Sequence, residues 1–523
     1  LTYAKTAVAD TSWIIDAPMP DLQLDGAIDL HNNTYQYYYT CEGVDLAAFN
    51  TYCAKLVNNA YSLYIQNDNV EGSYFRTYVN GAKTRMIHVI YAAYAHADEQ
   101  MIGEAQLSTM FDPALRVIVA DVDGTNVNLL PEEWVNGTKS YTKLTDTMIT
   151  SVNIEPDNIG NCYVITLEDG TFVVMDGGGG GDEAADAKLL YDTLYALHTK
   201  VHGSAPTESN PITIAAYYLS HGHNDHFVVF NKFANTYAKS ASYPVRINAV
   251  FANFISDDEA YNSYDPNINF GRNYLGTSNW YTNSDGTPVL YYKVQTGQRF
   301  YLCNVEFEVL YTHGDTYPWG IEYFNNSSTV IRTTIHNGGG DNVTVNDLSD
   351  LTVSGTSSIW TGDLQYRGSQ VMRATYGDYL ESDTVQISHH SGNGAEGELY
   401  VLVNARVVFL PSNFSRVNFT GTSNTCVVNR MWLENTHWQY IILHEAYNVT
   451  IMVTKDGMQM GLSQMFDVTD ESVQFEFGIS IATRANIGEF GLDADKLWPV
   501  TDNDDVVSGN IFTDVEIDFA ENN

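Results

Sequence analysis

The sequence predicts an α/β protein in which buried strands alternate with amphipathic helices. Residues 212–219 form an apolar run that is typical of a buried strand, and the apolar residues just after 226 recur at helical spacing. An earlier stretch repeats this order, with strands at 162–167 and 172–175 and a helix at 184–202. Hydrophobic residues make up 44% of the chain, a globular value, so we expect ordered structure over most of it.

The length of the chain limits its domain organisation, and its charge limits the class of its partners. Its 523 residues are enough for about two or three domains, each with its own core. We predict an N-terminal arm with a small α+β domain at 1–150, an α/β domain at 151–460, and a C-terminal strand with an acidic tail at 461–523. The formal net charge of −39 makes nucleic acid a poor partner, because phosphate binding depends on Lys and Arg.

The N-terminal 150 residues contain one clear helix and several strands. Residues 1–40 are polar and weakly periodic, and we interpret them as an extended arm. Asp45 can cap a helix whose apolar stripe comprises Leu46, Phe49, Cys53, Leu56 and Val57. Strands are predicted at 74–79, 86–94 and 115–120. No convergent set of reactive side chains is visible in this region.

Cysteines and sequons indicate the compartment. The five cysteines include no CxxC pair, so they do not form a zinc knuckle, and in an oxidising compartment we expect a Cys41–Cys53 disulfide. Eight asparagines begin Asn-x-Ser/Thr sequons: Asn32, Asn136, Asn325, Asn326, Asn342, Asn413, Asn418 and Asn448.

The chain begins at Leu1 without a methionine, which we interpret as a processed start, and no apolar run approaches the length of a membrane span. We therefore expect a secreted glycoprotein.

A glycine run follows the strand at 172–175. Asp176 ends that strand, and five glycines occupy 177–181. Glycine permits tight backbone conformations and close approach to a site. A phosphate-cradling loop is the competing interpretation, but no Lys-Ser or Lys-Thr follows the glycines, which disfavours a P-loop.

Four potential metal ligands lie directly after the buried strand at 212–219. They are spaced His-x-His-x-Asp-His, at His221, His223, Asp225 and His226. The first two are two residues apart on an extended segment and can point to the same side, while the last two, at a helix start, can turn toward a second position. Imidazole and carboxylate together suit zinc, iron or manganese better than calcium or magnesium. The cluster predicts a metal site, and one such loop can serve two metals.

Three of the later strands are followed directly by potential ligands. We predict strands at 245–254, 299–311, 328–335, 357–360 and 384–387. His313 follows the second of these, Asp363 follows the fourth in Thr361-Gly362-Asp363, and His389-His390 follow the fifth. The stretch at 256–297, rich in Tyr, Asn, Asp and Gly, is predicted to be a long loop that covers the site or carries binding contacts.

With these residues the chain resembles the metallo-β-lactamase superfamily of dinuclear metal hydrolases. The resemblance covers roughly residues 150–460 and rests on the Asp176-Gly-Gly turn, the cluster at 221–226 and the three later strand ends. Part of it is similar to the branch that contains bacterial DNA-uptake proteins and the phosphorylcholine esterases of teichoic acid. The resemblance implies a four-layer αββα sandwich, with the metal site at one edge of the two sheets.

The family pattern also implies a ligand set for two divalent metal ions, zinc first, with iron or manganese as alternatives. Its members are His221, His223 and His313 for the first metal, Asp225, His226 and His390 for the second, and Asp363 as the bridge. Asp225 and His389 are the expected catalytic residues, with His389 binding substrate or stabilising the transition state. Asp176 is implied to orient a ligand loop.

Two departures from the family patterns bear on the reaction. The branch often has His-His-Gly-Ser, whereas this chain has His389-His390-Ser391-Gly392. True β-lactamases of the superfamily typically replace the last histidine of the cluster and recruit a cysteine. Here His226 is present and no cysteine lies at a corresponding position, which argues against antibiotic hydrolysis.

The function implied by the resemblance is hydrolysis by a metal-bridging hydroxide. Phosphate mono- and diesters are the first substrate class, because a dinuclear site can clamp both the attacking and the leaving oxygen, and lactones or other esters come second. The substrate would be a small molecule or a cell-surface ester.

The alternative class is an extracellular structural or adhesive protein that retains the fold and self-assembles into surface arrays or filaments. We favour the enzyme, because all seven expected ligand positions are filled. A nuclease of the same fold is disfavoured by the charge.

Overall fold

The structure is a computed structural model that describes most of the chain between residues 17 and 411 and short stretches of its C-terminal part. The described residues are 17–30, 32–97, 111–124, 127–137, 140–152, 154, 160–179, 181–255, 281–336, 342–344, 356–392, 394–405, 407–411, 440–443, 449–454, 457–460, 481–482 and 515–517.

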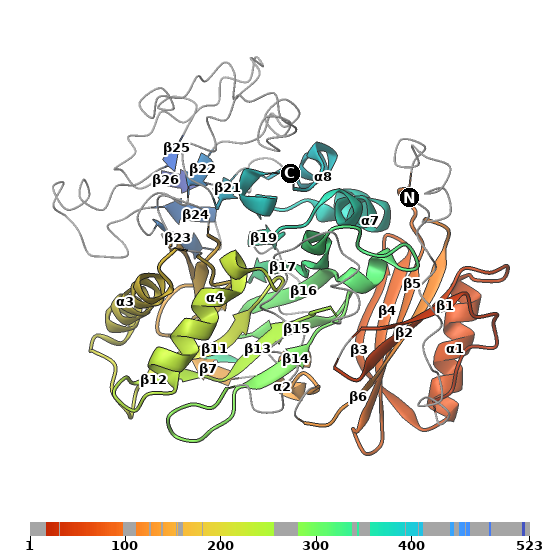
Figure 1. The fold of residues 1–523 in the computed structure, drawn as a ribbon, viewed down its shortest axis with the longest axis horizontal. Coiled ribbons are helices and arrows are strands. Elements are labelled where there is room, and N and C mark those ends of the chain that lie inside the picture. The colour runs from red at the N-terminus through yellow and green to blue at the C-terminus, as the bar shows by residue number, and fades with distance from the viewer. Residues whose placement is uncertain are drawn as a thin grey trace, which may run out of the picture.

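Two mixed β-sheets form the centre of the molecule (Figure 1). The first runs, in spatial order, through β14 (Leu290–Lys293), β13 (Ala249–Ala252), β11 (Ile212–Tyr218), β10 (Phe172–Met175), β9 (Tyr163–Thr166), β8 (Met148–Ser151), β23 (Val449–Thr454), β24 (Gly457–Met460) and β26 (Val515–Ile517), with β12 (Val245–Ile247) paired to β11. The second runs through β15 (Arg299–Leu302), β16 (Val305–Tyr311), β17 (Val330–Ile335), β19 (Thr356–Trp360), β20 (Thr384–Gln386), β21 (Val407–Leu410), β22 (Tyr440–Leu443) and β25 (Ile481–Ala482).

The two sheets pack face to face over an aromatic core. Phe251 of the first sheet lies edge-on to Phe300 and Phe307 of the second, with ring centroids 5.3 and 5.6 Å apart. Tyr163 of the first sheet also packs against Trp360 of the second, with ring centroids 5.1 Å apart and the rings tilted. Each aromatic ring removes a large apolar area from water, so this layer supplies much of the stability of the sandwich.

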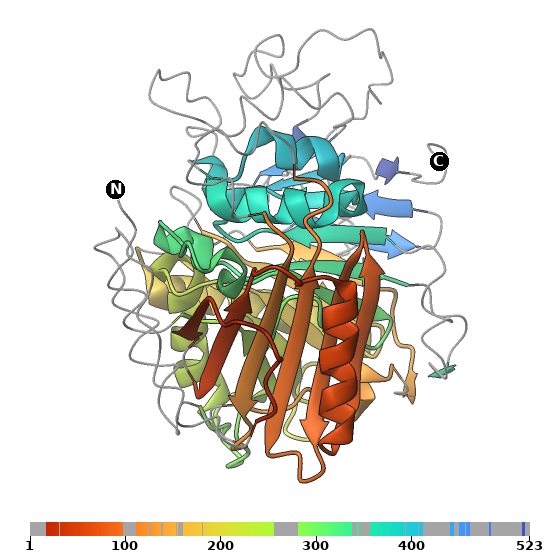
Figure 2. The same ribbon diagram turned by 90° about the vertical axis from the view of Figure 1, so that its right-hand side faces the viewer.

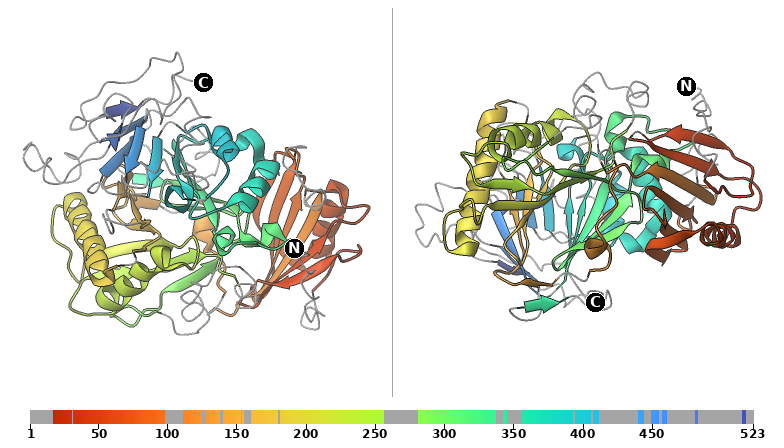
Figure 3. Two further views of the ribbon diagram at one scale, coloured as in Figure 1. Left: turned by 45° about the horizontal axis from the view of Figure 1, so that its top comes forward. Right: turned by 90° about the horizontal axis from the view of Figure 1, so that it is seen from below.

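Helices cover the outer faces of both sheets (Figures 1 and 3). On the first sheet α3 (Glu183–His202) and α4 (Asn224–Phe233) share a buried cluster with the strands, and on the second sheet α7 (Tyr366–Tyr376) and α8 (Gly397–Val403) do the same. Asp182 caps α3 by accepting hydrogen bonds from the amides of Ala184 and Ala185. The predicted α/β class and the four-layer αββα sandwich are confirmed.

The N-terminal region forms a separate antiparallel sheet covered on one face by α1 (Leu46–Asn58) (Figure 2). Its strands, in spatial order, are β1 (Gly26–Asp29), β2 (Thr34–Tyr39), β6 (Ala114–Asp121), β5 (Arg85–Ala92), β4 (Ser73–Asn80) and β3 (Tyr61–Val70). The extended arm predicted for 1–40 was therefore wrong over β1 and β2. Tyrosines are buried on both faces of β2, so the strand shows no alternation of polar and apolar residues.

Helix α1 begins where it was predicted, but two details of that region were wrong. Asp45 accepts a hydrogen bond from the amide of Ala48 at 2.8 Å, as expected for a cap. Val57, assigned to the apolar stripe, is 57% exposed. The predicted Cys41–Cys53 disulfide is absent and both thiols are free, because Cys53 faces the core under α1 whereas Cys41 follows the end of β2.

Three predicted sequon asparagines lie inside the folded chain. Asn32, Asn325 and Asn326 are 8%, 5% and 0% exposed. A glycan on any of them would have to displace packed neighbours, so these three are not acceptors in the folded protein.

Short elements complete the described chain. They are α2 (Glu132–Val135), the ladder of β7 (Ser140–Thr142) with β18 (Asn342–Thr344), η2 (Ala234–Ala238), η3 (His313–Thr316), η4 (Phe324–Ser327), η6 (Gly377–Leu380) and η7 (Ser388–Ser391). No helix among the described residues is long and apolar enough to cross a membrane. The predicted domain boundaries at 150 and 460 stay predictions, and the two sheets of the sandwich include β25 and β26 from beyond 460.

The second face of the N-terminal sheet packs against the sandwich, and a buried arginine joins the two. Arg116 on β6 is 1% exposed. Its guanidinium donates hydrogen bonds to the carbonyl oxygens of Gly314, Asp315 and Tyr317 at 2.7 to 2.9 Å, and it lies over the ring of Tyr38. The N-terminal domain thus holds the backbone of the segment that carries His313.

We expect the Arg116→Leu variant to lose about 2–4 kcal/mol of unfolding free energy, because it leaves buried carbonyl oxygens without a donor. Urea denaturation followed by circular dichroism measures this loss. The control is Lys83→Met, which removes an exposed ion pair with Glu132 and should change stability by less than about 0.5 kcal/mol. Equal effects of the two substitutions would contradict the role given to Arg116.

Candidate metal centre

The candidate metal centre lies where strands of both sheets end. His221 and His223 follow β11 of the first sheet, Asp363 follows β19 of the second, and His390 follows β20, the parallel neighbour of β19. Because these ends meet at one edge of the sandwich, residues far apart in the sequence come together. Loops beyond strand ends are common positions for such sites.

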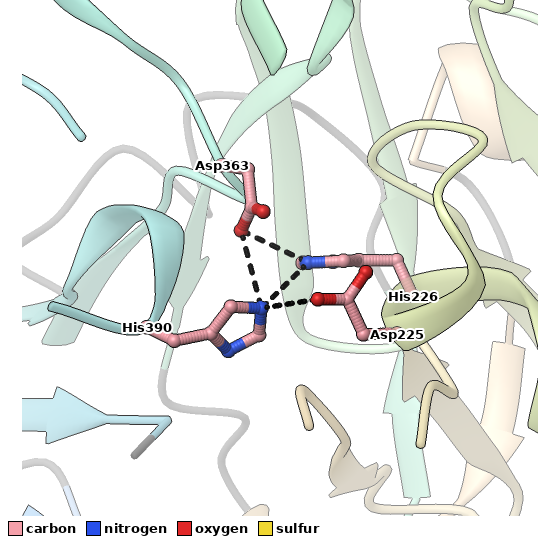
Figure 4. Close-up of side chains that lie close together, drawn as sticks. All are labelled: Asp225, His226, Asp363 and His390. Atoms are coloured by element: carbon pink, nitrogen blue, oxygen red, sulfur yellow. Dashed lines mark hydrogen bonds and ion pairs between the residues drawn. The ribbon is translucent and has the colours of Figure 1, made fainter. Parts of the chain in front are cut away.

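Six of the seven predicted ligands form two groups that share Asp363. The ligand atoms of Asp225, His226, Asp363 and His390 all lie within 4.8 Å of one another, and so do those of His221, His223 and Asp363. Figure 4 shows the first group, in which Asp363 Oδ1 is 2.9 Å from His226 Nε2 and 3.6 Å from His390 Nε2. Asp363 Oδ2 faces the other group, 3.8 Å from His221 Nε2. The carboxylate therefore presents one oxygen to each group.

Hydrogen bonds on the far side of two rings determine which nitrogens face the centre as acceptors. His390 Nδ1 donates to the carbonyl oxygen of Pro411 at 2.9 Å, and His226 Nδ1 donates to Asp176 Oδ2 at 2.8 Å. In the neutral rings both Nε2 atoms then carry lone pairs, and these atoms are 3.2 Å apart. Facing lone pairs beside two carboxylates repel unless a cation lies between them, so this donor set fits a divalent metal.

Burial and neighbouring charges shift the pKa values within the centre. Burial opposes ionisation of Asp363, but the imidazoles of His226 and His390 outweigh it and hold the pKa of Asp363 well below its usual range. Burial lowers the pKa of His221 far below the ordinary value, and His226 and His223 lower it further. For His226 burial acts in the same direction, but Asp363 and Asp176 outweigh it, so its pKa is raised well above normal. A neutral His221 and ionised carboxylates are the states that bind metal.

The glycine run allows the ligand loop to approach closely. The Gly177 amide donates to the His226 carbonyl at 2.8 Å, and the Gly177 carbonyl accepts from the amide of Val229 at 2.8 Å. A Cβ atom on Gly178 would lie 1.6 Å from the backbone carbonyl group of Asp225, so only glycine fits there. The glycines therefore pack against the first turn of α4, as the close-approach interpretation predicts.

Asp176 lies beneath the centre and orients two of its residues. Its carboxylate accepts hydrogen bonds from His226 Nδ1, from Asn161 Nδ2 and from both the amide and the hydroxyl of Ser220, at 2.6 to 2.8 Å. The same Ser220 hydroxyl is 3.1 Å from His221 Nδ1. This is the orienting role expected for Asp176, while sequence reasoning missed Asn161 and Ser220 because neither belongs to a recognisable spacing.

Gln386 positions the turn that carries Asp363, and it was also missed. Its Oε1 atom accepts from the amides of Thr361 and Gly362 at 2.9 and 2.8 Å, and Nε2 donates back to the Gly362 carbonyl at 3.1 Å. Gly362 has φ +54, and a Cβ atom there would lie 2.6 Å from that of Ser220. The Asp363 amide donates to Ser328 Oγ at 3.0 Å, so the backbone of this turn is held from two sides.

His313, the seventh predicted ligand, lies in neither group. Its Nε2 atom is 3.1 Å from Asn253 Oδ1. Asn253 directs its amide nitrogen at the Val294 carbonyl and at Gln295 Oε1, so its oxygen faces His313 and the histidine is the donor. His313 Nε2 thus holds a proton where a ligand needs a lone pair, and the geometry gives no support to its assignment to the first metal.

The adjacent histidines His389 and His390 have different partners. His390 Nε2 is 3.1 Å from Asp225 Oδ2, within the first group, whereas His389 Nε2 is 3.2 Å from Asn325 Nδ2 and 3.9 Å from Asp363 Oδ2. Their φ angles of 53° and 50° are both left-handed, a strained conformation that turns both rings toward Asp363. This geometry favours His390 as the ligand and His389 as its neighbour.

One side of the centre is open to solvent. The side chains of His221, His226, Asp363 and His390 are at most 1% exposed, whereas those of Asp225 and His389 are 23% and 30% exposed. The ring of Phe324 packs against His223 with centroids 4.6 Å apart. A substrate would therefore approach past Asp225 and His389.

Comparisons with known proteins add two distant structural likenesses. No family model matches the chain, and no curated protein matches it in sequence. A metallo-beta-lactamase with a HARLDQ motif from Cronobacter sakazakii is 13% identical over 49% of this chain and 79% of that chain, with a TM-score of 0.24. Unliganded yeast PDE1 is 10% identical over 55% of this chain and 93% of that chain, with a TM-score of 0.31. Both TM-scores are below 0.5, so the assignments above depend on the geometry of this chain alone.

Binding of zinc to the metal-free protein near pH 7 should release protons, about one for the group that contains His226. The raised pKa of His226 keeps that ring protonated, and a metal can bind only after the proton leaves. Affinity should therefore rise with pH and weaken by up to about tenfold per pH unit as the medium becomes more acidic. Calorimetric titration in buffers of different ionisation enthalpy measures the protons released. Binding enthalpies that are identical in all buffers would contradict this assignment.

Proposed function

We propose that this protein is a metal-dependent hydrolase with a dinuclear centre that cleaves phosphoesters. The observation that carries the proposal is the division of Asp363 between two donor groups, one oxygen to each. A buried carboxylate in this position suits a bridge between two cations. Four of the six grouped residues are histidines, which favours zinc, with iron or manganese as alternatives.

The charge of the centre supports an anionic substrate. Two divalent cations would outweigh the carboxylates of Asp225 and Asp363 and leave a locally positive site in an otherwise acidic protein. Such a site attracts a single phosphate group, while the acidic surface repels a polyanion such as nucleic acid. A small phosphomonoester or phosphodiester is therefore the favoured substrate.

The metals and the residues of the chain have separate roles at this site. When bound, the metals supply Lewis acidity toward the phosphate oxygens and activate water for attack. Asp176 and Gln386 hold the ligand loops, Phe324 packs over the ring of His223, and His389 lies on the open side where it can contact the substrate.

An extracellular location remains part of the proposal. It is supported by the acidic composition, and the buried sequon asparagines give it no support.

Elemental analysis and hydrolysis of bis(p-nitrophenyl) phosphate test the proposal together. We expect about two metal ions per chain in the wild type. The Asp363→Asn variant, which weakens the shared carboxylate, should keep about one or fewer and lose at least about 100-fold in kcat/KM.

The matched control is His313→Gln, because His313 lies outside both groups and donates its Nε2 proton to Asn253. It should retain the full metal content. If the His313→Gln variant binds less metal than the wild type, His313 belongs to the ligand set. A wild-type protein that binds no metal even with added zinc would contradict the hydrolase and put the structural or adhesive alternative first.

A further inference from the structure

The segment η4 packs against the ligand loop and is tied to the helix that follows Asp363. Asn326 Oδ1 accepts hydrogen bonds from the amides of Gln365 and Gly368 at 3.1 and 3.0 Å, and its Nδ2 donates to the Ile321 carbonyl at 2.9 Å. Both ends of the Asn326 amide are thus satisfied. This fixes the position of η4, and of Asn325 within it, relative to the metal centre.

Asn325 is buried like Asn326 but is only half satisfied. The residue is 5% exposed, and Nδ2 lies 3.2 Å from His389 Nε2. Its Oδ1 atom is buried and has no hydrogen-bond partner in the described part of the chain. A buried amide oxygen without a donor lowers stability, so an unsatisfied oxygen next to a candidate centre needs a reason.

The contact between Asn325 and His389 also determines which ring nitrogen carries the proton. The Asn325 amide nitrogen can only donate, so His389 Nε2 accepts and the ring proton is on Nδ1. The ring is then held in one orientation on the open side of the centre, where His389 is 30% exposed at its side chain. Asn325 therefore lies directly behind the residue that a substrate passes.

We infer that Asn325 is a specificity residue of this site: its Oδ1 atom accepts a hydrogen bond from the substrate while its Nδ2 atom orients His389. The matching substrate is a phosphoester with a hydroxyl or N–H donor close to the phosphate. Such a donor supplies the hydrogen bond that the folded chain leaves unmade, and a site built to bind a donor discriminates against an analogue that lacks it. This inference rests on the proposed phosphoesterase function.

The test compares two diesters that differ by one hydroxyl, 3-hydroxypropyl p-nitrophenyl phosphate and propyl p-nitrophenyl phosphate. The wild type should prefer the hydroxylated diester by about tenfold or more in kcat/KM. The Asn325→Leu variant keeps the branched shape and the number of side-chain heavy atoms but removes both polar ends, so that preference should disappear. Metal content should be unchanged, because Asn325 belongs to neither ligand group.

Thermal unfolding separates this role from a purely structural one. The unsatisfied oxygen lowers stability, and its removal offsets the loss of the hydrogen bond to His389, so Asn325→Leu should have the same Tm as the wild type or a higher one. The control Asn235→Leu makes the same change at an exposed position on η2, where it should alter neither Tm nor the preference between the diesters. A preference that persists in Asn325→Leu, or a marked fall in its Tm, would overturn the inference.

Nitrogen NMR of the histidine rings gives a readout that needs no turnover. In metal-free wild type the His389 ring, identified by comparison with His389→Gln, should carry its proton on Nδ1, and in Asn325→Leu this single tautomer should give way to a mixture. A wild type that hydrolyses neither diester would sink the proposed function. The tautomer and the Tm would then decide the role of Asn325 by themselves, and a proton on Nε2 in the wild type would overturn it.

Discussion

The centre depends on one buried carboxylate. Asp363 is 1% exposed and surrounded by imidazoles, and a charge removed from water in this way is stable only when it is paired. The turn that carries it is held by Gln386 and Ser328, and Gly362 gives that turn room beside Ser220. The chain thus uses polar groups of neutral side chains to keep a charged side chain in place between the two groups of potential metal ligands.

The histidines of the centre are held in place by outer hydrogen-bond partners in the same way. The Nδ1–H groups of His226 and His390 donate hydrogen bonds to fixed acceptors, the carboxylate of Asp176 and the carbonyl oxygen of Pro411. These outer contacts fix the tautomers, so that in the neutral rings lone pairs point inward. His313 has the opposite arrangement, since Asn253 accepts its proton. The outer partner therefore distinguishes a ring arranged to bind metal from one that is not.

Sequence reasoning recovered the parts of the molecule that are encoded locally. The strand before His221, the capped helix α1 and the cluster at 221–226 are each readable from about ten consecutive residues. It failed where a residue acts through distant partners. From the sequence, Gln386 is predicted only to be part of an apolar strand, Asn325 to be a glycosylation site and β2 to be an arm, because the partners of each lie far away in the chain.

The pairing of β8 with β23 joins residues 148–151 to residues 449–454 in the middle of the first sheet. During synthesis on the ribosome, almost three hundred further residues are added after β8 before its neighbour strand β23 exists. The six-stranded N-terminal sheet, by contrast, pairs only within 26–121 and can form early. Its docking face then remains bare until the sandwich is complete, which makes this nascent chain a natural client for chaperones that shield exposed apolar surface.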